Sequence, residues 1–400
     1  MRLLFVNYEF PPIGGGAAYA SLATARELVA MGHVVHFLTA GSRTDRRDEQ
    51  IDGIWVHRVL AYRKGVHDAG LLGAASFLVS AAIRLRSLLR AERFDALHYY
   101  FGLPTGLLSI LPGSHARLPY IVSLRGSDVP GYDQALRQLH RGLWPLTRRI
   151  WRRAFRVVAN SGDLRRLALQ SMPGLAIDVI PNGAAVPELQ SPRTTKSTGI
   201  RVLTVCRLIP RKDIETLIVA LSRTNDPSMT LDIAGEGPLA DSLVALARSL
   251  QVERRIRFHG YVGRAGLAAL RAAADIFVLT SISESCSMAL LESIAAGIPT
   301  IATRVGGTCE LVEHGRSGLL IGAKDSQELC DALELLAANP TLRKEFSRAG
   351  RRLISERFSW LMTARRYEAL FLAATGQPLP HRALESGDGH GVSAIDERVA

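Results

Sequence analysis

The sequence predicts an α/β protein made of two doubly wound domains, each a parallel sheet flanked by helices. Its 400 residues exceed the usual size of one domain. Short apolar runs alternate with helical patterns along the chain, which is typical of βαβ units. A polar, turn-rich segment at residues 187–199 separates two series of such runs and predicts a linker. Two domains joined there would face each other across a cleft at the carboxyl ends of their strands, where such sheets bind ligands.

The first domain is expected over residues 1–186. Its strands are predicted where apolar residues form short buried runs: Leu3–Asn7, Val34–Thr39, Ile54–Arg58, Ala96–Tyr99, Tyr120–Leu124, Arg156–Ala159 and Asp178–Ile180. Its helices are predicted where apolar residues recur at helical spacing: Ala18–Met31, Ala69–Leu89, Gly142–Ala154 and Ser161–Gln170.

The second domain is expected over residues 200–358, where the alternation restarts. Its predicted strands are Arg201–Val205, Leu231–Ala234, Ile256–His259, Ile276–Leu279, Thr300–Ala302 and Gly318–Ile321. A helix at residues 359–375 follows. The tail at residues 376–400 is rich in Gly, Pro, Ser and charge, and it is predicted to be disordered.

The composition is that of a soluble globular enzyme, with 47% apolar and 22% charged residues. The first apolar run is too short for a signal peptide. The longest run, Leu71–Ile83, has 13 residues, whereas a membrane-spanning helix needs roughly 17–25. We therefore expect a cytoplasmic protein. The 4 cysteines form no Cys-x-x-Cys, which argues against a disulfide framework or a zinc site.

The net charge of +12 lies mainly in the first half of the chain. Residues 1–178 hold 23 Lys and Arg against 13 Asp and Glu, whereas residues 179–400 hold 26 against 24. Arginines at 84–90 and 148–156 stand beside apolar residues. They fit peripheral contact with an anionic membrane at its inner face, and they fit an ordinary solvated helix face somewhat better. Nucleic acid is not an expected partner, because no known motif spacing or stacking platform accompanies the charge.

Glu284 and Glu292 are the most informative pair of residues in the chain. They bracket a predicted loop and a helix that starts near Ser287, directly after the buried run at residues 275–280. Their eight-residue spacing is a little over two helical turns, so both carboxylates can address one ligand. The helix N-terminus between them offers free N–H groups to an anion. Carboxylates can bind the hydroxyls of a sugar or ribose, and amides can bind phosphate. The combination therefore predicts a nucleotide-sugar site.

Two loops at predicted strand ends add groups for a diphosphate. The segment Pro11-Pro-Ile-Gly-Gly-Gly16 lets the backbone approach a ligand closely, although a plain strand–helix turn is an equal alternative. A dinucleotide fingerprint lacks its acidic partner, since no acid follows the second strand before Asp45. In the second half, Arg207 can grip a diphosphate bidentately and Lys212 can act as a point charge.

Two other strand ends in the second half give weaker predictions. Gly235-Glu-Gly-Pro238 is expected to be a structural turn. Backbone groups around Tyr261, in the segment 258–262, are candidates for contact with a nucleobase. His259 alone is expected to be a satisfied core histidine.

Three charged residues have two open interpretations each. Glu310 either accepts a ligand hydroxyl or serves as an acid in the first turn of a helix. Arg125 and Asp128 either line the cleft or pair with each other in a turn.

Taken in order, these segments resemble glycosyltransferase family 4 over about residues 1–372. The matching segments are Gly14–Gly16, Val179–Gly183, Arg207 with Lys212, Gly235–Pro238, Glu284 and Glu292 as the family's Glu-x7-Glu, Glu310–Leu320, and Phe358–Trp360 with the helix through Tyr367. The resemblance implies the GT-B arrangement of two Rossmann-like domains. It also implies that the helix at residues 359–375 crosses back to the first domain.

The resemblance further implies retaining transfer from a UDP- or GDP-linked sugar to a glycan or lipid-linked acceptor. By this likeness the donor contacts would be Arg207 and Lys212 on the diphosphate, Glu292 on the ribose, Glu284 on the sugar, amides of Ser287, Met288 and Ala289 on the phosphates, and Gly15 and Gly16 near the diphosphate from the opposite domain. The family often has a histidine where Arg125 stands. A guanidinium cannot serve as a base, so the transfer of that histidine's role to Arg125 stays open.

The departing nucleoside diphosphate needs positive charge to stabilise it. No Asp-x-Asp occurs in the chain, so we expect no metal ion and no other cofactor. We assign the task to Arg207, Lys212 and helix-end amides. Removing either cation is expected to cost at least about 10²–10³ in turnover, with little change in thermal stability. The alternatives are a GT-B nucleotide-sugar epimerase, a GT-B glycan phosphorylase and, less favoured, a Rossmann oxidoreductase.

Overall fold

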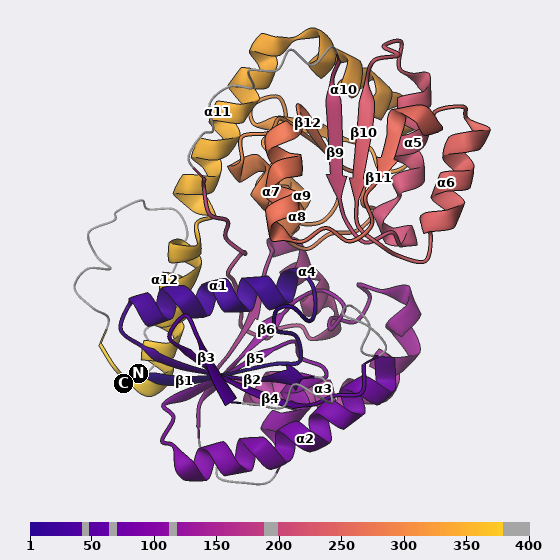
Figure 1. Cartoon of the computed structure of the whole chain (residues 1–400). Coiled ribbons are helices and arrows are strands. Elements are labelled where there is room, and N and C mark those ends of the chain that lie inside the picture. The colour runs from indigo at the N-terminus through magenta and orange to yellow at the C-terminus, as the bar shows by residue number, and fades with distance from the viewer. Residues whose placement is uncertain (42–47, 64–69, 112–117, 188–198, 379–400) are drawn as a thin grey trace.

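A computed structural model describes residues 1–41, 48–63, 70–111, 118–187 and 199–378. The chain forms two α/β domains stacked end to end, with the first domain in indigo to magenta and the second in rose to orange (Figure 1). The predicted linker at 187–199 and tail at 376–400 fall almost wholly outside the described residues.

The first domain is built on an eight-stranded sheet in the order β3-β4-β2-β1-β5-β6-β7-β8. The strands are β1 Arg2–Asn7, β2 Val34–Gly41, β3 Asp48–Ile51, β4 Ile54–Leu60, β5 Ala96–Tyr100, β6 Tyr120–Leu124, β7 Arg156–Ala159 and β8 Ile177–Val179. All pair in parallel except β3, which forms an antiparallel hairpin with β4. The central strands β1, β5 and β6 are almost wholly buried, because helices cover both faces of the sheet.

Helices α2 (Gly70–Ala91), α3 (Arg137–Arg153) and α4 (Gly162–Ser171) pack on one face of this sheet. Helix α1 (Gly16–Ala30) packs on the other face. Short 3₁₀ turns occur at η1 (Thr105–Ile110) and η3 (Gln134–Leu136).

The second domain has a six-stranded parallel sheet in the order β11-β10-β9-β12-β13-β14. Its strands are β9 Arg201–Val205, β10 Thr230–Ala234, β11 Ile256–Phe258, β12 Ile276–Leu279, β13 Thr300–Thr303 and β14 Gly318–Ile321. Its helices are α5 Ile214–Arg223, α6 Ala240–Ser249, α7 Arg264–Ala273, α8 Met288–Ala295, α9 Thr308–Leu311, α10 Ser326–Ala338 and α11 Pro340–Arg357, with 3₁₀ turns η4 Pro210–Lys212 and η5 Glu253–Arg255. Helices α5, α6 and α10 cover one face of the sheet, and α8 and α11 cover the other.

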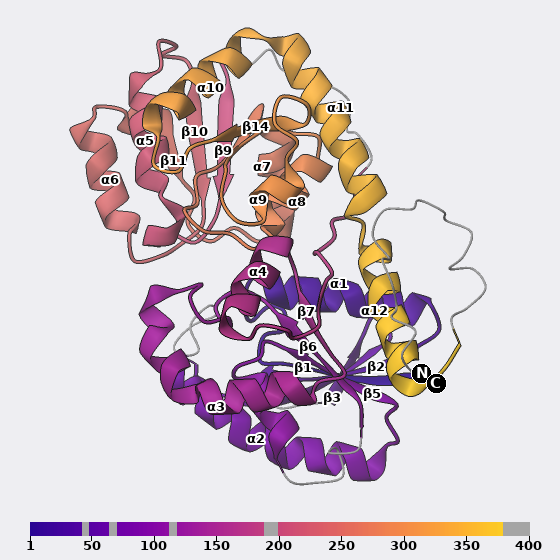
Figure 2. The same cartoon turned by 180° about the vertical axis from the view of Figure 1, so that it is seen from behind.

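The last helix, α12 (Trp360–Thr375), returns to the first domain and lies beside α1 (Figure 2). Its buried residues Ala364, Tyr367 and Phe371 join the core on that face of the first sheet. Where the chain passes the start of α12, a Cβ at Gly183 would come within 2.5 Å of Trp360 N, so only glycine fits there. The fold class and the crossing helix are therefore confirmed.

Two details of the first domain differ from the sequence prediction. Helix α3 begins at Arg137 rather than Gly142, and Pro145 lies inside it. Strand β3 was not predicted, because its residues Asp48-Glu-Gln-Ile51 lack an apolar pattern. The turn that forms its hairpin is Asp52-Gly53, and both residues have positive φ, which favours the tight hairpin turn.

Candidate active site

The predicted site residues lie on loops where the two domains meet. The parallel strands of both sheets direct their carboxyl ends toward the opposite domain, so the loops that follow them form this junction (Figure 1). The second domain contributes the loops after β9 and β12, and the first contributes the loop between β1 and α1.

Lys212 and Glu284 form a buried polar pair on the second domain's side of the junction. Lys212 Nζ contacts Glu284 Oε1, and the Ser281 hydroxyl donates a hydrogen bond to the same oxygen at 2.8 Å. The loop of Lys212 is tied to the loop of Glu284, because Thr280 Oγ1 donates to Lys212 O at 2.9 Å. These contacts fix both charged groups in place.

Glu284 is an ionised carboxylate in this arrangement. Burial by itself would raise the pKa of Glu284, but the Lys212 ammonium and the hydrogen bonds from Lys212 and Ser281 lower the net pKa below its ordinary value. Such a carboxylate accepts hydrogen bonds, as sugar hydroxyls require.

Helix α8 begins four residues after Glu284 and adds backbone donors to the junction. Ser287 caps the helix, and its hydroxyl accepts from Leu290 N at 3.4 Å. The first N–H groups of a helix have no partner within the helix, which leaves the amides of Met288 and Ala289 available. A Cβ at Gly16 would lie 3.0 Å from Met288 Cγ, so the glycine-rich loop of the first domain packs directly against this helix start.

The glycine-rich loop already binds a carboxylate of its own domain. Gly15 N donates to Glu9 Oε2 at 3.3 Å. A Cβ at Gly14, where φ is +97°, would lie 2.6 Å from Glu9 Cβ, so the close approach depends on glycine. A Cβ at Gly15 would meet no atom within 4 Å. The loop is therefore an accessible backbone surface with a donor that suits an anionic oxygen.

Glu292 lies further along α8 and pairs with Arg271 of α7. Its side chain is 32% exposed, whereas that of Arg271 is 12% exposed. Glu292 also acts electrostatically on Tyr19 of α1. Burial, Tyr261 and Glu292 raise the pKa of Tyr19, and Arg264 lowers it. Glu292 and Tyr261 thus lie near the first domain's helix at the junction.

Arg207 is exposed on the loop after β9. Within the part of the chain that the structure describes, no hydrogen bond or ion pair engages its side chain. Its guanidinium is therefore available to an added anion.

Arg125 connects several segments near the junction. Its Nη1 donates to Asn182 Oδ1 at 2.8 Å, and its guanidinium carbon lies 4.5 Å from the centre of the Tyr100 ring. Its Nη2 lies 3.4 Å from the Tyr367 hydroxyl on α12. Asn182 in turn donates to Cys286 O in the loop before α8, at 3.2 Å. Arg125 is thus linked through one residue to the loop that carries Glu284.

Asp128 organises a turn instead of lining the junction, in agreement with the second of its two open interpretations. It is 2% exposed. Its oxygens accept from the backbone N–H groups of Gly102 at 2.7 Å, Arg125 at 2.8 Å and Gly126 at 3.0 Å. Burial raises the pKa of Asp128, and the N–H bonds from Gly102 and Arg125 oppose the rise only in part. The expected pairing with Arg125 occurs through the backbone, which a sequence pattern does not distinguish from a side-chain pair.

Glu310 lies in the first turn of α9, as one of its two interpretations expected, and its side chain also caps a helix of the opposite domain. Its Oε2 accepts from Gly162 N at 3.1 Å and its Oε1 from Asp163 N at 3.2 Å. Both N–H groups belong to the first turn of α4. The carboxylate therefore joins the two domains at a positive helix end, and both of its oxygens are engaged.

Two motifs of the second domain shape the loop that carries Arg207. A Cβ at Gly235 would lie 1.7 Å from Cys206 O, and one at Gly237 would lie 2.3 Å from Leu208 O. The turn thus packs against that loop, in agreement with a structural role. His259 Nε2 lies 2.7 Å from Asp232 Oδ1, so this histidine is a satisfied one.

Sequence reasoning missed two aromatic–arginine contacts that join the domains. The Arg211 guanidinium lies 5.1 Å from the centre of the Tyr132 ring, and that of Arg264 lies 5.3 Å from the centre of the Tyr19 ring. Burial raises the pKa of Tyr132, and Glu284 adds to the rise, so this tyrosine lies near the polar pair. No local pattern indicates either contact, because each joins residues from different domains.

The structure also bears on metal and thiol chemistry. Across the described residues, no group of three or more His, Cys, Asp and Glu side chains is placed to hold a metal ion. The 4 cysteines are free thiols. Burial raises the pKa of Cys206 to about 11, so it is protonated at neutral pH.

Two facing doubly wound domains with a returning C-terminal helix form the GT-B architecture. Two family models match the chain: "Glycosyl transferase 4-like domain" over residues 14–183 and "Glycosyl transferases group 1" over residues 187–353. Glycogen synthase of Mycobacterium tuberculosis is 30% identical over 94% of this chain and 95% of its own length. The chain belongs to glycosyltransferase family 4 and is a hexosyltransferase.

Other relatives and solved structures agree with this placement. A mannosyltransferase of Mycobacterium tuberculosis, described as GDP-mannose-dependent and acting on phosphatidylinositol monomannoside, is 24% identical over 90% of this chain and 95% of its own. Sucrose-phosphate synthase from Thermosynechococcus elongatus superposes with a TM-score of 0.80 at 20% identity, over 94% of this chain and 99% of its own. The Anabaena protein HepE, solved with UDP-glucose, gives a TM-score of 0.72 at 19% identity, over 93% of this chain and 100% of its own. Because both identities are low, these two structures show the fold alone.

Proposed function

We propose that the protein transfers a sugar from a UDP- or GDP-linked donor to a glycan or lipid-linked acceptor, with retention of configuration and without a metal ion. The observation that carries the proposal is the Lys212–Glu284 pair ahead of α8, whose start packs against the glycine-rich loop. A fixed cation, free amides and an ionised carboxylate occur together there. These are the groups that a sugar joined to a diphosphate requires.

The donor diphosphate would lie between the domains. Arg207, which has no partner among the described residues, and Lys212 would bind its oxygens together with the amides of Met288 and Ala289. Gly15 N would approach from the first domain in place of its bond to Glu9. Glu292 would accept the ribose hydroxyls.

In the proposed reaction, the bond between the anomeric carbon and the diphosphate oxygen breaks and its electron pair leaves with the nucleoside diphosphate. The acceptor hydroxyl forms the new bond on the same face of the sugar, and its proton passes to the departing phosphate oxygen. Arg207, Lys212 and the α8 amides stabilise the charge that develops on the leaving group. We assign Glu284 to orienting the donor sugar, since Lys212 and Ser281 already engage its carboxylate.

The acceptor and location are proposed on coarser grounds. One curated relative is described as acting on a phosphatidylinositol mannoside and another as a lipopolysaccharide core glycosyltransferase. The first half of this chain is strongly basic. Both points favour an acceptor joined to a lipid or to a surface glycan, reached from the cytoplasm at the inner face of the membrane.

The donor can be identified with the purified protein and a panel of ligands. UDP or GDP is expected to raise Tm, since a ligand at about 100 times its Kd stabilises by about 2.7 kcal/mol. The matching sugar nucleotide should be hydrolysed or transferred, as read by mass spectrometry, with or without EDTA. Stabilisation by NAD(P) alone would favour the oxidoreductase alternative. Inverted product by NMR, or EDTA inhibition reversed by Mg²⁺, would contradict retention or metal independence respectively.

The proposed leaving-group role can be tested with one variant and a matched control. Arg207→Ala is expected to lower turnover by roughly 10²–10³ while leaving Tm unchanged, because its side chain has no described partner. Arg254→Ala, on the exposed turn η5, removes the same charge away from the junction and should keep full activity. Near-normal transfer by Arg207→Ala would remove the proposed role.

A further inference from the structure

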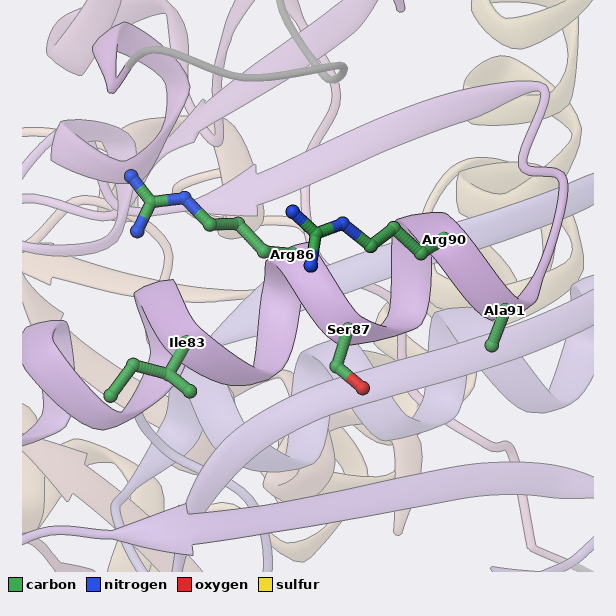
Figure 3. Close-up of a pocket in the computed structure, with 5 residues that line it drawn as sticks. All are labelled: Ile83, Arg86, Ser87, Arg90 and Ala91. Atoms are coloured by element: carbon green, nitrogen blue, oxygen red, sulfur yellow. The ribbon is translucent and has the colours of Figure 1, made fainter.

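Helix α2 carries an apolar and cationic stripe along its outer face. Leu72, Val79 and Ile83 are 72%, 65% and 66% exposed and recur at helical spacing. The stripe continues through the exposed Arg86 and Arg90. These arginines extend from the same side of α2, one turn apart, beside a shallow hollow of about 500 Å³ (Figure 3). The stripe is thus apolar in its first half and positive in its second.

The opposite face of α2 is committed to the protein core. Gly73, Phe77, Ala81, Leu85 and Leu88 are buried against the first sheet. By length and composition, α2 is also the single helix among the described residues that could cross a membrane. Because one face packs on the sheet, lipid could not surround it. Its outer stripe suits a position in the plane of a membrane interface.

The neighbouring helix on the same face of the sheet shares the positive charge. Helices α2 and α3 together contain nine arginines and no Asp or Glu. The six in α3, all exposed, are Arg137, Arg141, Arg148, Arg149, Arg152 and Arg153. By contrast, α1 and α12 on the opposite face contain three arginines and two glutamates. Helix α4, on the same face as α2 and α3, adds two arginines and one aspartate. This face of the first domain is therefore selectively cationic, which a generally basic composition does not explain.

This combination distinguishes between possible partners. A second copy docked through the same face would bring like charges together. Nucleic acid would satisfy the arginines but would leave Leu72, Val79 and Ile83 without an apolar contact. An anionic lipid surface satisfies both, because headgroup phosphates bind arginines and the interface accepts aliphatic side chains.

We propose that the face formed by α2 and α3 docks on an anionic lipid bilayer, with Leu72, Val79 and Ile83 inserted and the arginines on the headgroups. Since α2 follows β4, its apolar half starts on the side where the first sheet's carboxyl ends lie. The inference does not depend on the donor chemistry proposed above.

Vesicle flotation of the full chain tests this proposal. The protein should float with phosphatidylcholine vesicles that contain phosphatidylglycerol, remain in solution with phosphatidylcholine alone, and detach at high salt. Arg86→Gln with Arg90→Gln should weaken binding roughly tenfold or more, because each basic residue near an anionic surface contributes measurably to binding. Val79→Ser with Ile83→Ser should weaken binding through the apolar contact and leave the salt dependence in place.

A matched control has the same charge loss at the same helical spacing. Arg348→Gln with Arg352→Gln removes two exposed arginines from α11 of the second domain and should bind as wild type. The α2 variants should keep wild-type Tm and wild-type binding of UDP or GDP. Equal flotation of wild type and both α2 variants would overturn the proposal. So would a wild-type protein that ignores anionic vesicles but binds oligonucleotides or forms dimers through Arg86 and Arg90.

Discussion

Lys212 neutralises Glu284, a carboxylate that is only 9% exposed on its side chain. Lys212→Ala would leave that charge buried without its partner, which costs roughly 3 kcal/mol in comparable pairs. We therefore expect Lys212→Ala to lower both turnover and Tm near neutral pH. The sequence alone led us to expect little change in stability, because it does not reveal that the lysine has a buried partner.

The stability effect of Lys212 should depend on pH in a defined direction. The folded-state pKa of Glu284 is lowered from the ordinary value of 4.5. The pair thus stabilises fully above that value and loses its effect as pH falls through the folded-state pKa. The Tm difference between wild type and Lys212→Ala should narrow as pH falls from about 7 to below about 4. Calorimetry can follow it, with Arg207→Ala as the control, and a constant difference would contradict the role of the charge.

Arg271 is a positioning residue for Glu292. It pairs with Glu292, and its own buried Nε has no hydrogen-bond partner among the described residues. Arg271→Gln should raise the donor KM about tenfold, as expected for one charge-assisted contact, and leave kcat nearly unchanged. Arg271→Lys should recover part of the affinity. Equal losses in kcat and in affinity would indicate a different role.

At the scale of elements, the contact between Glu310 and helix α4 joins the domains. Glu310→Ala would leave the N–H groups of Gly162 and Asp163 without this cap, at a cost of roughly 1–2 kcal/mol. We expect a lower Tm and a larger radius of gyration by small-angle scattering. The control is Glu313→Ala, whose carboxylate pairs with Arg316 three residues away. Unchanged dimensions in Glu310→Ala would show that other contacts hold the domains together.

The strands were predictable because each central one is a short buried run with no competing pattern. Strand β3 lacked that pattern, and only the Asp52-Gly53 turn indicated it. The loops of the site were predictable for a topological reason, since carboxyl ends of parallel strands share one edge. The partners of the charged residues were not, because Glu310 and α4, or Arg264 and Tyr19, meet only after two distant segments have folded.

At the scale of the whole molecule, the two domains differ in charge and in the groups they present. The second carries the buried Lys212–Glu284 pair, and the first carries the face of α2 and α3 with its nine arginines. The charge difference was visible in the sequence. Its concentration on one side of the first sheet was not, because α2 and α3 are separated by two strands in the chain and come together only through the sheet.

The return of α12 has a consequence for how the polypeptide is made. The ribosome releases the first domain's strands early, but the helix that covers their α1 side is the last described one to emerge. At 5–20 residues per second, synthesis up to Thr375 takes roughly 20–75 s. During that interval Phe5 and His98 lack the cover that Tyr367 and Phe371 supply. The nascent chain therefore exposes an aromatic surface on which chaperones can act until translation ends.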